Sequence, residues 1–92
     1  MMILCAAIWV DDGKHHAHQP VETGLVFCGY RHCNIIPQIH IAGFLPQDSF
    51  PKIQGFLTKD GKFVNRKDAA NLAFTAGQIS EEKNELFSED LY

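Results

Sequence analysis

Cysteine is scarce in this sequence of 92 residues, and its spacing is irregular. Cys5, Cys28 and Cys33 are odd in number and form no CxxC pair, which argues against a disulfide framework and against a structural zinc site. We therefore expect reduced thiols and a cytoplasmic protein.

Long hydrophobic runs are also missing. The longest covers residues 1–10, which is too short to cross a bilayer, carries no basic residue, and is followed directly by Asp11, Asp12 and Gly13. We expect neither a signal peptide nor a membrane anchor, and no membrane partner.

Positive charge is sparse. The formal net charge is −3, and five of the 11 acidic residues lie in residues 80–92, where Lys83 is the single basic residue. Outside that segment seven basic residues stand against six acidic ones. This balance provides no basic field for polymeric nucleic acid, although a few local cations can still hold a small phosphate ligand.

Catalytic motifs are absent as well. The sequence has no Gly-rich phosphate loop, no GxSxG, no HExxH and no paired carboxylates outside the acidic tail. We considered Cys33, beside His32, as a nucleophile, but adjacent residues rarely form a catalytic pair and no third group is placed to orient a base. We interpret Cys33 as a small, half-buried residue. The sequence therefore predicts no enzyme and no cofactor.

Histidine is the exception, because His15, His16 and His18 crowd one short segment. Imidazoles are good metal ligands, and His16 and His18 could point the same way from an extended segment. No Cys or carboxylate is placed to complete a coordination shell. We interpret the segment as a solvated loop and predict no metal site.

Short apolar runs and turn residues predict a small α+β fold. Strands are expected at residues 2–10 and 25–28, and a hairpin at 55–64, where Asp60-Gly61 separates two aromatic and branched runs. The predicted order is ββαββα: a small antiparallel sheet of two N-terminal strands plus the hairpin, with two helices on one face. Residues 1–79 should form a single domain. Residues 80–92, the acidic C-terminal tail, should dock on the domain or on a neighbouring subunit.

The second helix has distinct start and stop signals. Asn65 suits an N-cap, Asp68 follows three residues later, and Gly77 suits a left-handed C-terminal turn. We expect a helix of about 11 residues that begins at Arg66. Its apolar stripe comprises Ala69, Leu72, Ala73 and Ala76.

The first helix, within residues 30–43, is complicated by Pro37. If Asn34 is the N-cap, Pro37 falls at the third helical position, where its missing N–H is tolerable. Alternatively the helix starts at Arg31 and bends at Pro37. The loop at residues 43–53 then leads to the hairpin.

The two helix starts carry the residues that best suit a ligand. Arg31 and His32 stand at the first start, and Asn65 and Arg66 at the second. A guanidinium group next to unpaired backbone N–H groups suits a phosphate.

Aromatic residues near these starts could stack a base, and we expect Tyr30, Phe56 and Phe63 to be exposed. From the residues alone an alternative stays open, in which Arg66 and Lys67 are solvated and Arg31 pairs with a surface carboxylate.

Several short motifs occur along the chain in an order similar to that found in a family of small phage-encoded proteins. They are Asp-Asp-Gly after the first strand, His-Gln-Pro, Gly-Tyr-Arg-His-Cys-Asn, Gln-Gly-Phe-Leu-Thr, Phe-Val-Asn-Arg, Ala-Gly-Gln-Ile and Phe-Ser-Glu-Asp-Leu-Tyr. The sequence resembles most the Thoeris anti-defence sponge proteins and the related anti-CBASS sponges. Those proteins bind cyclic ADP-ribose isomers and cyclic oligonucleotides without degrading them.

The resemblance implies a homo-oligomer, a dimer or a hexamer, with nucleotide pockets between subunits. It maps the pocket to Arg31, His32, Phe56, Thr58, Asn65, Arg66 and Gln78. Two departures bear on ligand preference: Cys33 replaces the second His of an Arg-His-His-Asn motif, and the loop before the hairpin is short.

These observations predict a phage anti-defence protein that sequesters a small cyclic nucleotide or cyclic ADP-ribose-type immune signal in the host cytoplasm without cleaving it. One alternative is a phage inhibitor that contacts a host protein through residues 86–92 and the aromatic side chains. A second is a nucleotide-cleaving or metal protein that uses the histidine segment or Cys33.

Overall fold

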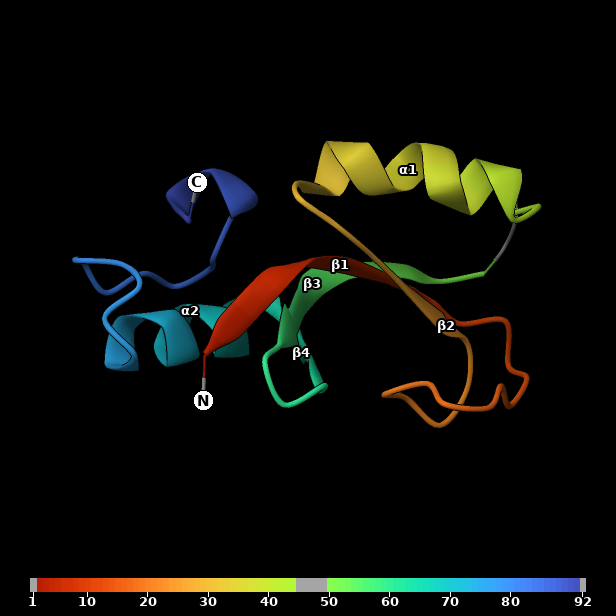
Figure 1. Ribbon diagram of the computed structural model, residues 1–92, viewed down its shortest axis with the longest axis horizontal. Coiled ribbons are helices and arrows are strands. Elements are labelled where there is room, and N and C mark those ends of the chain that lie inside the picture. Colours follow the sequence, from red (N-terminus) through yellow and green to blue (C-terminus); the bar gives the residue numbers. More distant parts are fainter. Residues whose placement is uncertain (1, 45–49, 92) are drawn as a thin grey trace.

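A computed structural model describes residues 2–44 and 50–91, and its elements follow the predicted order ββαββα (Figure 1). The elements are β1 (Ile3–Val10), β2 (Leu25–Gly29), α1 (His32–Ile41), β3 (Lys52–Thr58), β4 (Phe63–Asn65), α2 (Arg66–Thr75) and a short 3-10 turn, η1 (Ser88–Asp90). The predicted α+β class is confirmed. Part of the predicted loop, residues 45–49, and Tyr92 of the tail lie outside the described residues.

The central strand of the sheet is β1. Within the described residues the strand order is β2-β1-β3-β4, and each pair is antiparallel. Ala7 lies opposite Cys28 on one side and Gly55 on the other. The strand β3 is longer than the predicted hairpin arm, because Lys52 pairs with Val10. Pro51 marked this segment as loop in the sequence, yet the strand begins directly after it.

The hairpin between β3 and β4 forms where the Asp-Gly pair predicts it. Gly61 has φ +84°, a conformation that glycine adopts without steric cost. The Thr58 hydroxyl donates to Asp60 Oδ1 over 2.6 Å and accepts from the Lys62 amide over 3.1 Å. These bonds fix the turn from inside.

The start of α2 is the predicted one. Asn65 is the N-cap, and its Oδ1 accepts the Asp68 amide over 2.8 Å. Gly77 follows the C-cap with φ +75°. The buried stripe is rotated slightly from the prediction, because Ala70 is buried and Ala76 is exposed.

The start of α1 decides between the two alternatives. The helix begins at His32 with Arg31 as N-cap. The alternative in which the helix starts at Arg31 is therefore within one residue of the observed start, and the prediction of Asn34 as N-cap is wrong. Asn34 is the third helical residue, and its Oδ1 accepts the backbone amide of Arg31 over 3.1 Å. The Asn34 side chain therefore reaches back to the N-cap residue instead of being the N-cap itself. Pro37 lies inside the helix.

The core is a cluster to which β1, β3, both helices and the C-terminal tail contribute. Phe56 and Leu86 are its largest aromatic and tail members, and both have no exposed surface. Figure 1 shows α1 and α2 toward opposite ends of the sheet, so the helices share a core without lying side by side.

Replacing Asn65 with alanine should lower the free energy of unfolding by about 1 kcal/mol, because the Asp68 amide loses its acceptor. Urea unfolding followed by circular dichroism measures the change. Asn71→Ala, at an exposed position of the same helix, is the matched control and should change it by less than about 0.5 kcal/mol. Equal losses for the two variants would contradict the capping role.

Candidate functional site

His32 lies where the first turn of α1 meets β3. Its imidazole is buried, with Nε2 2.8 Å from the Gly55 carbonyl oxygen and its ring edge-on to Phe56 at a centroid distance of 5.1 Å. Because a carbonyl can only accept, Nε2 carries the proton and donates. Burial lowers the pKa of His32, and the charge of Arg66 lowers it further, against an opposing effect of the Gly55 bond. The ring is therefore neutral near pH 7.

Arg66 extends from the first residue of α2 toward β3 and the tail. Its Nη2 donates to Gln54 Oε1, and its guanidinium carbon lies 4.5 Å from the centroid of the Phe87 ring. Its Nε is buried and has no hydrogen-bond partner within residues 2–44 and 50–91. Such an unsatisfied donor on a charged group is costly.

Arg31, the N-cap of α1, lies close to the same stretch of tail. Its Nη1 is 3.8 Å from Glu89 Oε1, and its guanidinium carbon is 5.7 Å from the centroid of the Tyr30 ring. The Glu89 side chain is 70% exposed, so water screens this ion pair and makes it weak. The pairing of Arg31 with a surface carboxylate, the alternative that the sequence left open, is thus present.

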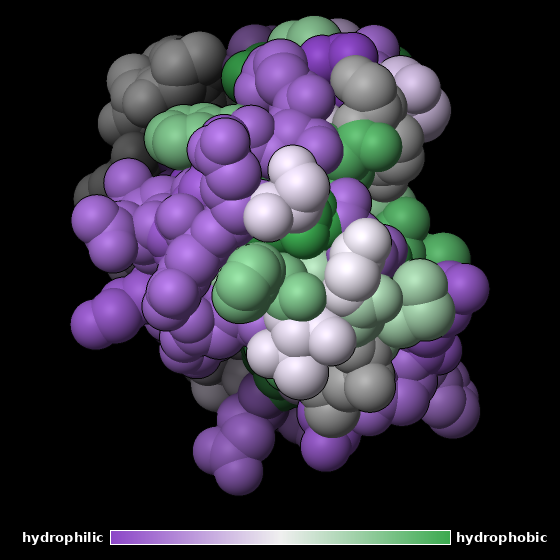
Figure 2. All heavy atoms as spheres, turned by 90° about the vertical axis from the view of Figure 1, so that its left-hand side faces the viewer, coloured by the Kyte–Doolittle hydropathy of each residue, from purple (hydrophilic) through white to green (hydrophobic). Residues whose placement is uncertain are grey.

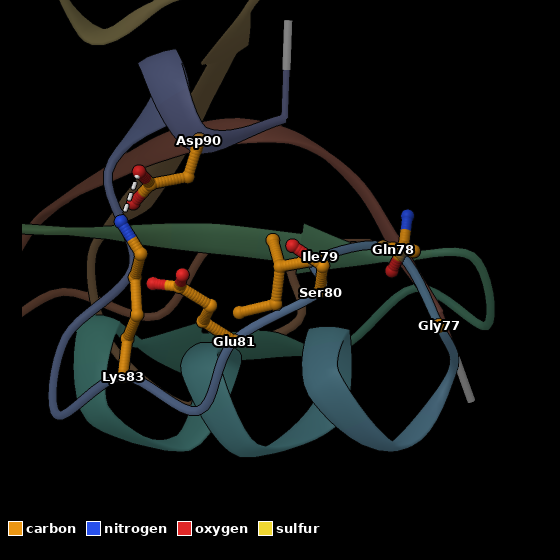
Figure 3. Close-up of a pocket in the computed structure, with 7 residues that line it drawn as sticks. All are labelled: Gly77, Gln78, Ile79, Ser80, Glu81, Lys83 and Asp90. Carbon is orange, nitrogen blue, oxygen red and sulfur yellow. Dashed lines mark hydrogen bonds and ion pairs between the residues drawn. The ribbon is translucent and has the colours of Figure 1, made fainter.

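The tail connects the two helix starts. The Leu86 amide donates to the Arg66 carbonyl over 2.9 Å, and the Leu86 side chain is fully buried. Lys83 Nζ donates to Asp90 Oδ1 over 2.6 Å (Figure 3). Asp90 Oδ2 accepts the Phe87 amide. These bonds hold Phe87 against Arg66 and Glu89 near Arg31.

Phe56 differs from its expected role. It was expected to be an exposed stacking surface, but its side chain has no exposed area, so this expectation is wrong. In the sheet Phe56 lies opposite Ala6, and its ring packs against His32. Phe56 therefore positions His32, whereas Tyr30 and Phe87, with 60% and 41% of their surface exposed, are open to solvent near the arginines.

Three further predicted residues are engaged elsewhere. Thr58 is buried in the hairpin turn, and Asn65 caps α2. Gln78 binds Ile3 through both ends of its amide, at 2.8 Å and 3.0 Å. The structure thus gathers Arg31, His32, Phe56 and Arg66 around the tail. Thr58 instead stabilises the hairpin turn, Asn65 caps α2, and Gln78 binds the backbone of Ile3.

A groove lies next to this cluster, between α1 and the strands β1 and β3. It encloses about 340 Å³ and is lined by Ile8, Ile36, Ile39, His40, Lys52 and Gln54. We call it the α1–β3 groove. Since Gln54 accepts the bond from Arg66, the groove and the arginine cluster adjoin.

A second hollow, of about 470 Å³, lies beneath the tail and is lined by Gly77, Gln78, Ile79, Ser80, Glu81, Lys83 and Asp90. Figure 3 shows Lys83 already paired with Asp90 across it. With two carboxylates and one paired amine, it is poorly suited to a phosphate.

The histidine segment forms local bonds. His16 Nε2 lies 2.9 Å from Asp12 Oδ2, and His15 Nδ1 lies 3.2 Å from the Glu22 carbonyl oxygen. Within residues 2–44 and 50–91 no three His, Cys, Asp or Glu side chains are placed to hold a metal ion. Cys33 is exposed, so the expected half-burial is wrong.

Comparison with protein families shows to which family the chain belongs. Residues 2–92 match the family model described as Phage T4 y16D protein. The chain belongs to this family. No curated protein and no solved structure matches it. No helix within residues 2–44 and 50–91 is long and apolar enough to span a bilayer.

Sequence reasoning missed three residues that this phage family member places against the arginines: Gln54, Phe87 and Glu89. The signal for Phe87 and Glu89 is the terminal motif Phe-Ser-Glu-Asp-Leu-Tyr, whose place in the chain indicates kinship but not which residues it contacts. Gln54 carried no local signal, since its role depends on Arg66, 12 positions away.

The free energy of unfolding should decrease as the pH falls below about 6.5, because His32 binds a proton more readily in the unfolded chain. The stability is fully present above that pH and is lost as the pH approaches the lower pKa of the folded state. Urea unfolding at pH 5.0 to 7.5 measures the slope. In His32→Gln the slope should be flatter, although the variant is less stable at pH 7.

His18→Gln, at an exposed residue of the histidine segment, is the control and should keep the slope of the parent protein. A parental slope in His32→Gln would show that other groups cause the pH dependence.

Proposed function

We propose that this phage protein binds and sequesters a small cyclic nucleotide or cyclic ADP-ribose-type immune signal in the host cytoplasm, without cleaving it. The observation that carries the proposal is the convergence of two arginines from two helix starts on one tail segment. Arg66 brings a buried Nε that lacks an acceptor among the described residues.

The chemistry of this cluster suits phosphate. Guanidinium groups bind phosphate oxygens in a forked geometry, and helix N-termini add backbone donors. Arg31 and Arg66 stand at the N-cap and the first residue of their helices. His32 keeps Arg31 in place by fixing the helix start.

Sequestration needs affinity and does not need a reacting group. The partly buried thiol of Cys28 is unsuited to nucleophilic attack, because desolvation raises its pKa to about 11. The motif order that resembles the anti-defence sponges supports the class of ligand. Binding of polymeric nucleic acid would need a basic field, and the chain carries a formal charge of −3.

We propose a homo-oligomer, a dimer or a hexamer, as the working form. The arginine cluster is open on the side of Tyr30, which is 60% exposed and whose ring centroid lies 5.7 Å from the Arg31 guanidinium carbon. A second copy of the chain over this side would enclose a ligand that one chain only partly covers.

The alternative, a direct inhibitor of a host protein, receives less support from the tail. Leu86, part of the surface assigned to that contact, is fully buried. Figure 2 views the end of the molecule that carries α2 and the tail, where hydrophilic residues predominate and apolar ones occur in small groups between them. A broad apolar interface would instead form one contiguous apolar patch on this face.

The first test is a melting-temperature screen with cyclic dinucleotides, cyclic trinucleotides and cyclic ADP-ribose isomers. A bound ligand should raise the melting temperature and be recovered intact after denaturation, because preferential binding to the native state stabilises it by mass action. Arg31→Ala and Arg66→Ala should each weaken binding about tenfold or more.

Lys59→Ala, which removes one exposed positive charge from the hairpin turn, is the matched control and should bind like the parent. Folded arginine variants with parental affinity would disprove the site. An absence of any shift across the screen, together with capture of a host protein without ligand, would favour the alternative.

Glu89→Gln should tighten the binding of the same anionic ligand about two- to threefold, because an incoming phosphate no longer meets the carboxylate near Arg31. The effect is small since the pair is exposed, and isothermal titration at low salt is the suitable measurement. Glu85→Gln removes the same charge from a hollow beside Lys67 and should have less effect. Equal effects would indicate a change in net charge alone.

A further inference from the structure

The α1–β3 groove has an apolar floor and an incompletely covered rim. Ile8 and Ile39, each 3% exposed, form the floor, while Ile36 is 42% exposed beside them. At about 340 Å³ the groove is at the lower end of the range of roughly 300 to 1,000 Å³ typical of small-molecule sites. It therefore suits a small, flat apolar group.

The polar groups around this floor are donors or neutral amides. His40, Lys52 and Gln54 complete the lining, and the six lining residues include no carboxylate. An anionic ligand with a planar ring matches this combination, because its ring covers the isoleucines while its edge and charge meet the polar side chains.

The groove leads directly to the arginine cluster. Gln54 lines the groove and accepts a hydrogen bond from Arg66 Nη2, so one side chain separates the apolar floor from the guanidinium group. A ligand that lies in the groove can therefore place a phosphate at Arg66. Phe56 offers no competing stacking surface, because it is fully buried.

We propose that the α1–β3 groove is the nucleobase subsite: the base lies on Ile36 and Ile39, its polar edge meets His40 or Gln54, and the attached phosphate binds Arg66. This inference rests on the proposed nucleotide-binding function, and it names the part of the chain that recognises the base. It makes Ile36, an exposed apolar side chain on α1, a specificity-determining residue.

A pair of probes with the same phosphate separates the base from the rest of the ligand: adenosine 5′-monophosphate and ribose 5-phosphate. Isothermal titration should show that the parent protein binds the nucleotide at least about tenfold more tightly than the sugar phosphate. Ile36→Glu should remove this difference and leave the affinity for ribose 5-phosphate nearly unchanged. Ile36→Ala, a milder change at the same exposed position, should reduce the difference partially.

Ile41→Glu is the matched control, because Ile41 is 88% exposed on the same helix and does not line the groove. It should bind both probes like the parent. Arg66→Ala should weaken both probes together.

Two results would overturn the subsite and leave the phosphate site standing. One is equal affinity for the two probes with both dependent on Arg66, and the other is parental nucleotide affinity in Ile36→Glu. Failure of the parent to bind either probe would also overturn the subsite, while the screen with cyclic nucleotides decides the proposed function separately.

Discussion

The bond from His32 Nε2 to the Gly55 carbonyl is the constraint on which the arrangement of the site depends. A buried imidazole without a partner would be costly, so this bond fixes the first turn of α1 over β3. Gly55 is suited to the position, because a Cβ there would lie 2.2 Å from the Val64 carbonyl oxygen. Gly55 therefore sets two things at once: it allows β4 to approach β3 closely, and its carbonyl fixes the position of α1. Arg31 and Arg66 stand where they do because the elements that carry them meet there.

The electrostatic character of the cluster follows from that geometry. His32 is neutral because it is buried and near Arg66, so the positive charge resides on the two guanidinium groups. The tail supplies a carboxylate to Arg31 and an aromatic face to Arg66. Both are weak partners compared with a phosphate, since the carboxylate is screened by water and a cation–π contact at the surface contributes modestly. A ligand phosphate can therefore replace the Glu89 carboxylate at Arg31 and the Phe87 ring at Arg66.

Local signals in the sequence were sufficient for much of the fold. Asp60-Gly61 fixed the hairpin and Asn65 the start of α2, because each acts through backbone atoms within four residues. Contacts between distant segments were harder to predict. The burial of Phe56 depends on the arrival of α1, and the role of Gln54 depends on Arg66. Of the predicted site, Arg31, His32 and Arg66 could be predicted from their places at helix starts, which have general anion-binding properties, whereas Thr58 and Gln78 were implied by motif order alone.

Gln78 has an effect that extends beyond its own position. Its amide accepts from the Ile3 N–H and donates to the Ile3 carbonyl, so one side chain imitates a residue of a neighbouring strand at a point where β2 does not reach. The exposed edge of β1 is thereby closed against pairing with another chain. Because Gln78 also begins the segment that leads to the tail, fraying of β1 and release of the tail belong to one opening event. Amide hydrogens of β1 and of the tail would then exchange with a common free energy of opening, although Ile3 and Gln78 are 75 residues apart in the sequence.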